Sequence, residues 1–365
     1  MIPLVDLSLE KAVERSLVQA FRSVVKSKSY ILGNKVESFE KKFAKFTKSK
    51  YAVSVGSGTD ALRLSLRASG LGKGDKVLVP TLTSSFTVIA IVEEGAVPVF
   101  CDVDEKTFNV DPRDAETRID KKTRAIIPVH LFGNPCSMDK IVRLAKKYDL
   151  SVIEDCSQAH GAKFKNRFVG TLGNTGVFSF YPTKNLGALG DGGIVITNDK
   201  KLAKSVRLLR NGGQTKRFWH EYKGINSRLD ELQAAILEVK LKYLNRDNEK
   251  RQNLAKKYLR SFKGLPLKFQ EQNANAESVY HLFVVQTKKR DSLRKFLGKS
   301  GVMTDIYYPY PIHKQQAFKQ FASTSLPVSE KLAQVLLAIP IGPNLKAKDQ
   351  TYIIRKVKQF FGQGR

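Results

Sequence analysis

The sequence is poor in several residue types, and each shortage excludes a class of protein. Among 365 residues there are three cysteines, three methionines and one tryptophan. Cys101, Cys136 and Cys156 are odd in number and far apart, so they predict neither a disulfide framework nor a CxxC metal motif. We therefore expect the protein to work in a reducing, cytoplasmic compartment.

Long apolar runs are also missing. No stretch reaches the roughly 18 apolar residues that a membrane-spanning helix needs. The first residues, Met1–Asp6, show no basic segment followed by an apolar one, so we expect no signal peptide. The sequence therefore predicts a protein that does not sit in a membrane.

Acidic residues are few, with 34 Asp and Glu against 63 Lys and Arg, and the formal net charge is +29. Such a charge can attract nucleic acid or anionic lipid. However, the basic residues are spread over the whole chain, and no basic arm, zinc spacing or aromatic RNA-binding motif accompanies them. We interpret the charge as a solvated surface with no nucleic-acid partner, and it would favour a small anionic substrate.

Short β-branched runs alternate with amphipathic helical patterns over the first part of the chain. Met138–Tyr148, for example, places its apolar residues on one helical face. Such alternation is typical of a mostly parallel sheet between helices, and we expect an α/β large domain over residues 1–245. Its seven expected strands are 51–55, 76–80, 97–103, 124–131, 151–155, 177–180 and 193–197.

The pattern changes at Asn226. A helical pattern runs for more than 30 residues and predicts one long helix, or two in series. A loop (264–278), a strand (280–287) and a helix follow, and Asp291 is expected to be the N-cap of that helix and Gly301 its end. We expect residues 246–365 to form a small α+β domain.

A glycine-rich turn follows the first expected strand. In a parallel sheet, ligands bind beyond the carboxyl ends of the strands. The turn, Gly56–Ala61 (GSGTDA), opens a helix, and backbone N–H groups at a helix start bind phosphate well. It also fits a dinucleotide pattern, but the next strand ends in Pro80 and Thr81 without the acid that a ribose requires. We therefore favour a single phosphate.

Asp155 ends another apolar strand. A buried carboxylate needs a cationic or proton-donating partner, whereas the alternative is an ordinary helix N-cap, and both interpretations stay open. Cys156 beside it is either a small buried residue or, much less favoured, a nucleophile. His160 has no second metal ligand at a useful spacing, so we expect no metal site.

One lysine stands in a stretch that is almost without charge. Lys184 is the single charged residue between Phe168 and Gly190, although 27% of the chain is charged. Desolvation lowers the pKa of a lysine, and a neutral amine can attack a carbonyl group. The alternative is a solvated loop lysine. However, an isolated lysine, a strand-end aspartate and a phosphate turn with Ser179 nearby are together what pyridoxal phosphate (PLP) requires.

At this point the chain resembles a known family, the PLP-dependent sugar aminotransferases of the DegT/StrS group. The resemblance covers essentially the whole chain in family order: VGSGTDALRLSL, IIPVHLFG, VIEDCSQAHGA, GVFSFYPTKNLGALGDGG, NSRLDELQAAIL and YYPYPIHKQQAF. It implies a fold-type-I PLP-dependent transferase, with an aspartate-aminotransferase-like large domain and a small C-terminal domain.

The resemblance also implies roles for matching residues. Lys184 binds the cofactor covalently and moves the substrate proton, while Asp155 pairs with the pyridinium nitrogen. The other implied cofactor residues are Gln158 at the phenolic oxygen, Gly58, Thr59 and Ser179 at the phosphate, and Asn226, which reaches the phosphate of the partner in a homodimer. The implied substrate residues are His160, Arg228, Tyr308, Tyr310 and His313.

The sequence departs from the family pattern at one place. Ser84 stands where the family usually has an aromatic ring over the cofactor, and Phe86 follows two residues later. On a regular helix, two residues are about 200° apart. Either Phe86 reaches the ring through a different backbone path, or another group covers the cofactor.

The implied reaction transfers an amino group from glutamate, through pyridoxamine phosphate, to a keto-sugar on a nucleoside diphosphate. The product would be an amino sugar for lipopolysaccharide, glycan or secondary-metabolite synthesis. The segments PVHLFG and SFYPTKNLGALGDGG resemble members that aminate carbon 3, which favours a dTDP-3-keto-6-deoxyhexose and next a UDP-3-keto-N-acetylhexosamine. Amination at carbon 4 stays open, as does a sugar dehydratase or deaminase, although dehydratase relatives carry histidine in place of Lys184. A regulatory or nucleic-acid-binding protein is the distant alternative.

Overall fold

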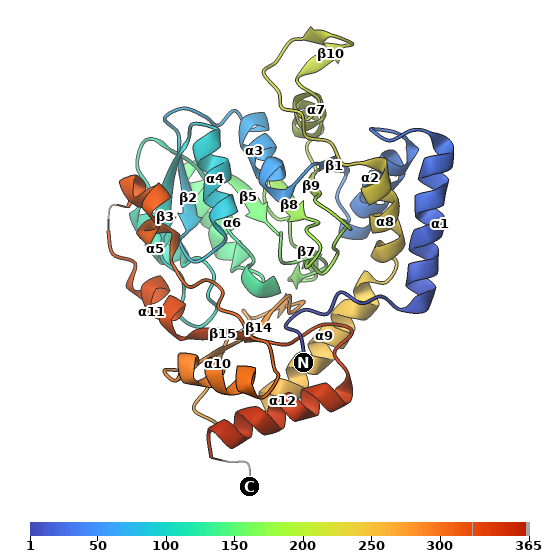
Figure 1. Cartoon of the computed structure of the whole chain (residues 1–365). Helices are drawn as coiled ribbons and strands as arrows, with labels where there is room; N and C mark the ends of the chain where they lie inside the picture. The colour runs from blue at the N-terminus through green and yellow to red at the C-terminus, as the bar shows by residue number, and fades with distance from the viewer. Residues whose placement is uncertain (323, 363–365) are drawn as a thin grey trace.

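A seven-stranded sheet forms the centre of the larger unit (Figure 1). The structure, a computed structural model, describes residues 1–322 and 324–362. The strand order is β1-β9-β8-β5-β4-β2-β3, and only β9 runs antiparallel to its neighbours. This confirms the expected, mostly parallel seven-stranded sheet. The strands are β1 (Tyr51–Val55), β2 (Lys76–Pro80), β3 (Val97–Cys101), β4 (Thr123–Ile126), β5 (Ser151–Asp155), β8 (Thr175–Ser179) and β9 (Gly193–Thr197).

Helices cover both faces of this sheet, so its strands are buried on each side. In β8, Val177 belongs to one apolar cluster and its neighbour Phe178 to another. Burial on both faces is the reason that these strands read as continuous apolar runs. The helices are α1 (Lys11–Ser27), α2 (Asn34–Thr47), α3 (Gly58–Ala68), α4 (Ser85–Glu93), α5 (Pro112–Thr117), α6 (Met138–Tyr148), α7 (Lys200–Leu209) and α8 (Glu231–Leu241).

Helix α2 is held against α8 by a buried carboxylate at its N-terminus. Glu231, the first residue of α8, accepts the backbone N–H groups of Gly33, Lys35 and Val36 at 2.8–2.9 Å. A carboxylate is favourable there because the first N–H groups of a helix have no partner within the helix. As a result, α1, α2 and α8 gather beside the β1 edge of the sheet (Figure 1).

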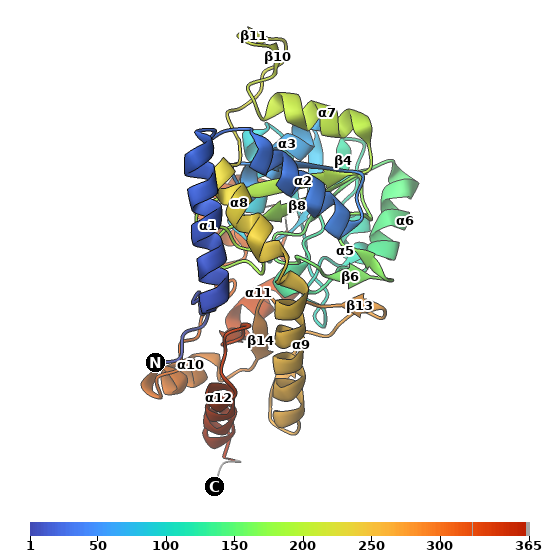
Figure 2. The same cartoon turned by 90° about the vertical axis from the view of Figure 1, so that its right-hand side faces the viewer.

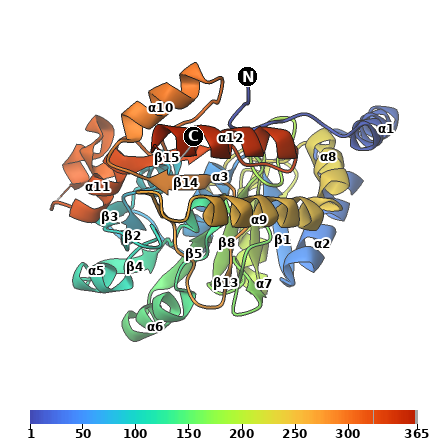
Figure 3. The same cartoon turned by 90° about the horizontal axis from the view of Figure 1, so that it is seen from below.

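The smaller unit is a three-stranded antiparallel sheet with helices, which confirms the expected small α+β unit. Its strands are β12 (Lys268–Phe269), β14 (Phe283–Gln286) and β15 (Leu336–Ile339), and its helices are α9 (Leu244–Ser261), α10 (Arg290–Lys299), α11 (Pro327–Val335) and α12 (Ala347–Phe360). Figure 3, which is seen from below, shows α9 and α12 in front of the large sheet. The proposed boundary between residues 245 and 246 falls in the first turn of α9, and Ile2 joins this unit through backbone bonds to Gly301 and Met303.

The remaining elements are short. The hairpin β10 (Gln214–Lys216) and β11 (Trp219–His220) projects away from the body of the protein (Figure 2). A second small sheet contains β6 (Lys163–Phe164), β7 (Arg167–Phe168) and β13 (Ala276–Glu277), and the 3₁₀ turns are η1 (Leu131–Gly133), η2 (Ile312–Lys314) and η3 (Gln316–Phe321). Over the described part of the chain, no helix combines the length and apolarity needed to span a membrane.

The alternative of two helices in series is confirmed, since α8 and α9 follow five non-helical residues that begin at Asn226. Three other local predictions are wrong. Asp291 is not an N-cap, because its carboxylate bonds the Arg290 side chain and the helix starts one residue earlier. The strand expected over 124–131 ends at Ile126, since Pro128 has no N–H group for a sheet. The loop over 264–278 also contains β12 and β13.

Candidate active site

Asp155 lies at the carboxyl end of β5 and is only 4% exposed. The hydroxyl of Thr87 donates a hydrogen bond to Oδ2 at 2.9 Å, and the Ser157 backbone N–H donates to Oδ1 at 3.0 Å. A turn follows Asp155, so the interpretation as a helix N-cap is wrong. A buried, oriented carboxylate of this kind can hold a cationic ligand group.

Lys184 lies in the turn after β8, where its backbone N–H bonds the Tyr181 carbonyl at 2.9 Å. The residue is half-buried. Burial lowers the pKa of its amine to about 8, although the nearby negative charge of Asp155 favours the ammonium form. A much larger fraction of the amine is therefore neutral at physiological pH than for a solvated lysine, as a nucleophile requires.

The start of α3 forms an anion-binding turn next to Ser179. Ser57 caps the helix by accepting the Asp60 N–H at 3.0 Å, which leaves the N–H groups before it available. A Cβ atom on Gly58 would lie 2.6 Å from the Cβ of Ser179, so only glycine permits this close approach. Thr59 lies in the same first turn and is half-buried.

Ser227 supports this turn and was missed by the sequence analysis. Its hydroxyl accepts the Gly56 N–H at 2.9 Å and donates to the Asp60 carboxylate at 2.8 Å. The signal for it was weak, because a serine inside NSR has no distinctive spacing. It follows Asn226 directly, and the Asn226 side chain is exposed.

These features fit PLP. The desolvated amine of Lys184 suits an aldehyde, Asp155 suits a pyridinium nitrogen, and the turn at Gly58 suits a phosphate. The negative charge of Asp155 acts on the pKa of the Lys184 amine, so the first two groups interact electrostatically. The donor set is therefore that of a PLP site, built from the ends of β1, β5 and β8.

Gln158 and Tyr308 lie side by side at this site. The Gln158 carbonyl accepts the Phe132 N–H at 2.8 Å, and its amide donates to the Tyr308 hydroxyl at 3.0 Å. Tyr308 also interacts with the side chain of Ser84, and burial raises the pKa of its phenol. Phe86 is 60% exposed at the start of α4, so the aromatic group that contacts Ser84 is Tyr308.

Two histidines expected at the substrate are engaged inside the protein. The His160 ring is fully buried beside Phe178 and Phe180, and burial lowers its pKa to about 3. His313 bonds Thr81 through Nδ1 at 2.8 Å and Glu330 through Nε2 at 3.1 Å. Hydrogen bonds thus occupy both ring nitrogens of His313, whereas neither ring nitrogen of His160 has a hydrogen-bond partner among the described residues. The expected roles of both histidines at the substrate remain proposals.

Two further expected substrate residues, Tyr310 and Arg228, and the expected phosphate residue Asn226 are at least partly exposed. Tyr310 is 69% exposed, and Asn226 is exposed while its backbone pairs with Asn211. Arg228 is half-buried and donates to the Asn211 side chain at 3.1 Å. In a single chain these side chains face solvent, so their expected roles remain proposals.

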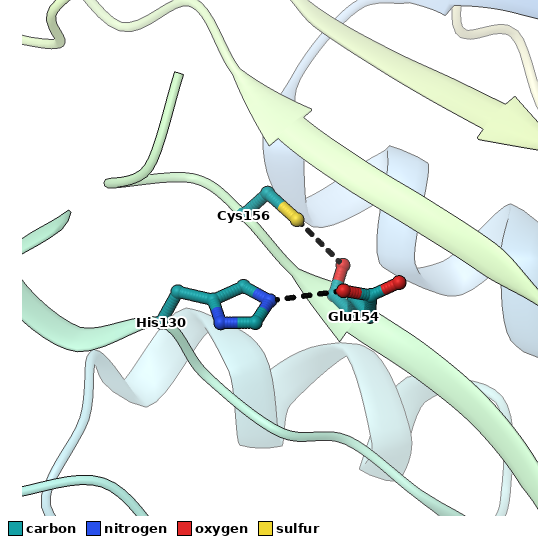
Figure 4. Close-up of side chains that lie close together, drawn as sticks. All are labelled: His130, Glu154 and Cys156. Atoms are coloured by element: carbon teal, nitrogen blue, oxygen red, sulfur yellow. Dashed lines mark hydrogen bonds and ion pairs between the residues drawn. The ribbon is translucent and has the colours of Figure 1, made fainter. Parts of the chain in front are cut away.

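A second polar cluster consists of His130, Glu154 and Cys156 (Figure 4). The last two of these residues flank Asp155 in the sequence. His130 Nδ1 accepts the Cys136 N–H at 3.0 Å, so Nε2 carries the proton and donates to Glu154 at 3.1 Å. Glu154 also accepts three backbone N–H groups, from Gly170, Leu172 and Gly173. Hydrogen bonds thus use the lone pairs that a metal would need, and the cluster fixes the 170–173 loop to β5.

The cysteine in this cluster is not a nucleophile. Burial raises the pKa of the Cys156 thiol well above its ordinary value. The reactive form of cysteine is the thiolate, which this environment disfavours. The interpretation of Cys156 as a small buried residue is therefore correct.

A buried amide network behind Lys184 was also missed. His281 Nδ1 lies 3.2 Å from the Asn185 carbonyl, and the Asn185 amide donates to Asn248 at 2.9 Å. Asn248 in turn donates to the backbone carbonyl of His160 at 2.8 Å. These residues are far apart in sequence, so only the proximity of Asn185 to Lys184 could have pointed to the network.

The fold and the site together define a fold-type-I PLP-dependent transferase. The sequence profile of the DegT/DnrJ/EryC1/StrS aminotransferase family matches residues 11–358. The chain belongs to this family, which confirms the resemblance seen in its motifs. It is an enzyme, a nucleotide-sugar aminotransferase.

Relatives cover the whole chain. It is 43% identical to the dTDP-3-amino-3,6-dideoxy-alpha-D-galactopyranose transaminase of Aneurinibacillus thermoaerophilus, over 99% of each protein. It is 41% identical to the UDP-N-acetyl-3-dehydro-alpha-D-glucosamine 3-aminotransferase of Acidithiobacillus ferrooxidans, over 98% of this chain and 97% of that protein. The crystal structure of S. venezuelae DesV in complex with a ketimine intermediate superposes with a TM-score of 0.95, at 40% identity over 98% of each chain.

Proposed function

We propose that this enzyme transfers the amino group of L-glutamate to carbon 3 of a keto-sugar linked to a nucleoside diphosphate. PLP and pyridoxamine phosphate would carry the amino group. The favoured acceptor is a dTDP-3-keto-6-deoxyhexose, and a UDP-3-keto-N-acetylhexosamine is second. Support comes from relatives named for amination at carbon 3 of dTDP and UDP sugars. The observation that carries the chemistry is the desolvated Lys184 beside Asp155.

Each residue of the site has a role in this proposal. Bound PLP supplies a protonated ring that withdraws electrons from the reacting carbon. Asp155, oriented by Thr87, would keep the ring nitrogen protonated, and Gln158 would orient the phenolic oxygen. In the first half-reaction Lys184 would move a proton from the α-carbon of the donor to the cofactor, and in the second it would move a proton from the cofactor to carbon 3 of the acceptor. Tyr308, held by Gln158, would cover the ring face beside Ser84 and exclude water there.

We also propose a homodimer in which Asn226 reaches the phosphate of the partner. Helix α1 exposes Val18, Phe21 and Val25 at i, i+3 and i+7, an apolar stripe that a second copy could cover. Phe218 at the tip of the projecting hairpin is also exposed. Light scattering after size exclusion should give twice the chain mass, and a monomer that retains full activity would contradict the shared site.

The test begins with the absorbance spectrum of the PLP-loaded protein. L-glutamate should bleach the cofactor band, and Lys184→Ala should lack a band that glutamate can bleach in this way. The glutamate-treated enzyme is then mixed with 3-keto and 4-keto sugars on dTDP and UDP, and products are identified by mass and NMR. Amination at carbon 4, or loss of a hydroxyl group from the sugar, would contradict the proposed reaction. A folded protein that never forms a cofactor band would refute the proposal that it is a PLP enzyme.

A further inference from the structure

Arg251 on α9 is a buried cation that forms no ion pair with any acid in the described part of the chain. Its side chain is 5% exposed, and among residues 1–322 and 324–362 no carboxylate lies within 4 Å of its guanidinium. Buried arginines are rare unless they are paired, because an uncompensated charge is costly to desolvate. Burial lowers the pKa of Arg251 to about 10, and the negative charge of Asp247 only partly opposes this. The Asp247 carboxylate accepts a hydrogen bond from Arg246 at 3.0 Å.

One edge of the Arg251 guanidinium is unused. Nη1 donates to the backbone carbonyls of Tyr280, His281 and Ile341 at 3.2–3.3 Å. Nε and Nη2 form no hydrogen bond with any residue that the structure describes. These two nitrogens form the planar edge that binds a carboxylate through two parallel hydrogen bonds.

Arg251 and Lys184 line the same cavity, which has a volume of about 100 Å³. The other walls are the N-terminal segment 5–10, Pro343 and Asn344, and the side of α8 and α9 that faces Lys184. Three acids line the cavity. Glu10 and Asp247 are bound to Arg246, and Asp6 accepts the Ser8 N–H at 2.9 Å. None of the three forms an ion pair with Arg251.

A neighbouring histidine shows that positive charge gathers here. Burial lowers the pKa of His281 well below its ordinary value, and the charges of Lys184 and Arg251 lower it further. His281 thus stays neutral between two cations. An anion that entered this cavity would meet a buried arginine on one wall and the reactive amine on another.

We infer that Arg251 binds a carboxylate of the amino donor and places its amino group toward Lys184. The ligand class is a dicarboxylic α-amino acid, and the inference rests on the proposed aminotransferase reaction. The keto-sugar substrates need no carboxylate, so Arg251 would recognise the donor and leave acceptor recognition to other residues. Arg251 is then a specificity residue for the first half of the reaction.

The experiment uses the PLP-loaded enzyme and its Arg251→Gln and Arg251→Lys variants. The binding probe is glutarate, a dicarboxylate without an amino group, measured by calorimetry and by its effect on the cofactor absorbance. Arg251→Gln should weaken glutarate binding about 10- to 100-fold and raise the KM for L-glutamate similarly. PLP affinity and the reverse half-reaction from the amino-sugar product should change little. Arg260→Gln, which changes an exposed arginine of the same helix, is the matched control and should bind glutarate like the wild type.

The outcomes separate this inference from the proposed function. A wild-type protein without a cofactor band would refute the function itself. A folded Arg251→Gln enzyme with a normal band and unchanged glutarate affinity would overturn the role of Arg251. If Arg251→Gln does not fold, the test uses two other measurements. These are the glutarate affinity of Arg251→Lys, and the affinities of the wild-type enzyme for glutarate and for uncharged glutaramide. Equal binding of the two ligands would then overturn the inference.

Discussion

Lys184 should react with PLP at pH values where an ordinary lysine is almost inert. The perturbation is the pH at which cofactor-free enzyme meets PLP. Lysine has an ordinary pKa of 10.5, and burial lowers that of Lys184 to about 8. At pH 7 the neutral fraction is then about 10% instead of about 0.03%, which is an increase of roughly 300-fold. The capture rate should rise with pH, reach half of its plateau near pH 8 and then level off.

The assay is stopped-flow absorbance of the apoenzyme mixed with PLP across this pH range. The rate at which butylamine reacts with PLP is measured in the same buffers. It corrects the pH dependence of the enzyme's capture rate for ionisation of the cofactor itself. Reduction with borohydride and peptide mass analysis should place the label on Lys184. Wild type and variants must first show the same circular dichroism, so that a lost rate is not a lost fold.

A second buried lysine provides the matched control. Lys240 lines the same cavity, and burial lowers its pKa too, but its amine donates to the Gly187 carbonyl. Lys240→Arg should leave the pH profile in place, whereas Lys184→Arg should abolish capture. A wild-type rate that still rises steeply above about pH 9.5 would show a solvated ammonium group and refute the reasoning.

Three further results are expected. Thr87→Val removes the hydroxyl that donates to Asp155 and should weaken PLP binding about tenfold in an absorbance titration, without a change in circular dichroism. Glu154→Gln breaks the buried cluster with His130 and should lower the urea unfolding free energy by about 3 kcal/mol. Glu330 has its pKa lowered from 4.5 to about 2, first by the Leu326 N–H, so its stabilisation is full above pH 4.5 and is lost as pH falls through about 2. Accordingly, Glu330→Gln should cost about 1–2 kcal/mol at pH 6, measured by urea unfolding, and much less at pH 2.

Local pattern was enough to predict the central sheet and its chemistry. The seven strands appear because buried parallel strands are continuous apolar runs bounded by turns, a signal that each segment carries alone. Asp155 and Lys184 were identifiable because each differs from its sequence neighbours. Asp155 is an acid at the end of an apolar strand, and Lys184 is a charged residue in a turn that is otherwise uncharged.

Contacts between distant segments were out of reach for the same reasoning. Arg251 looks like any other arginine on a basic helix, and only the fold shows that three carbonyls surround one of its nitrogens. Likewise, Tyr308 lies beside Ser84 although more than 200 residues separate them in the sequence. The position of His160 in its motif, in the same way, does not reveal that its ring packs against Phe178 and Phe180.

The backbone pairing of Ile2 with Gly301 and Met303 sets an order for folding during synthesis. Ribosomes add about 5–20 residues per second, so Ile2 waits roughly 15–60 s for its partners to be made. The segment that follows it, residues 5–10, forms a wall of the Lys184 cavity. In a nascent chain, residues 5–10 therefore cannot take their final position through Ile2 until Gly301 and Met303 have been synthesised. The cavity beside Lys184 is complete only near the end of translation.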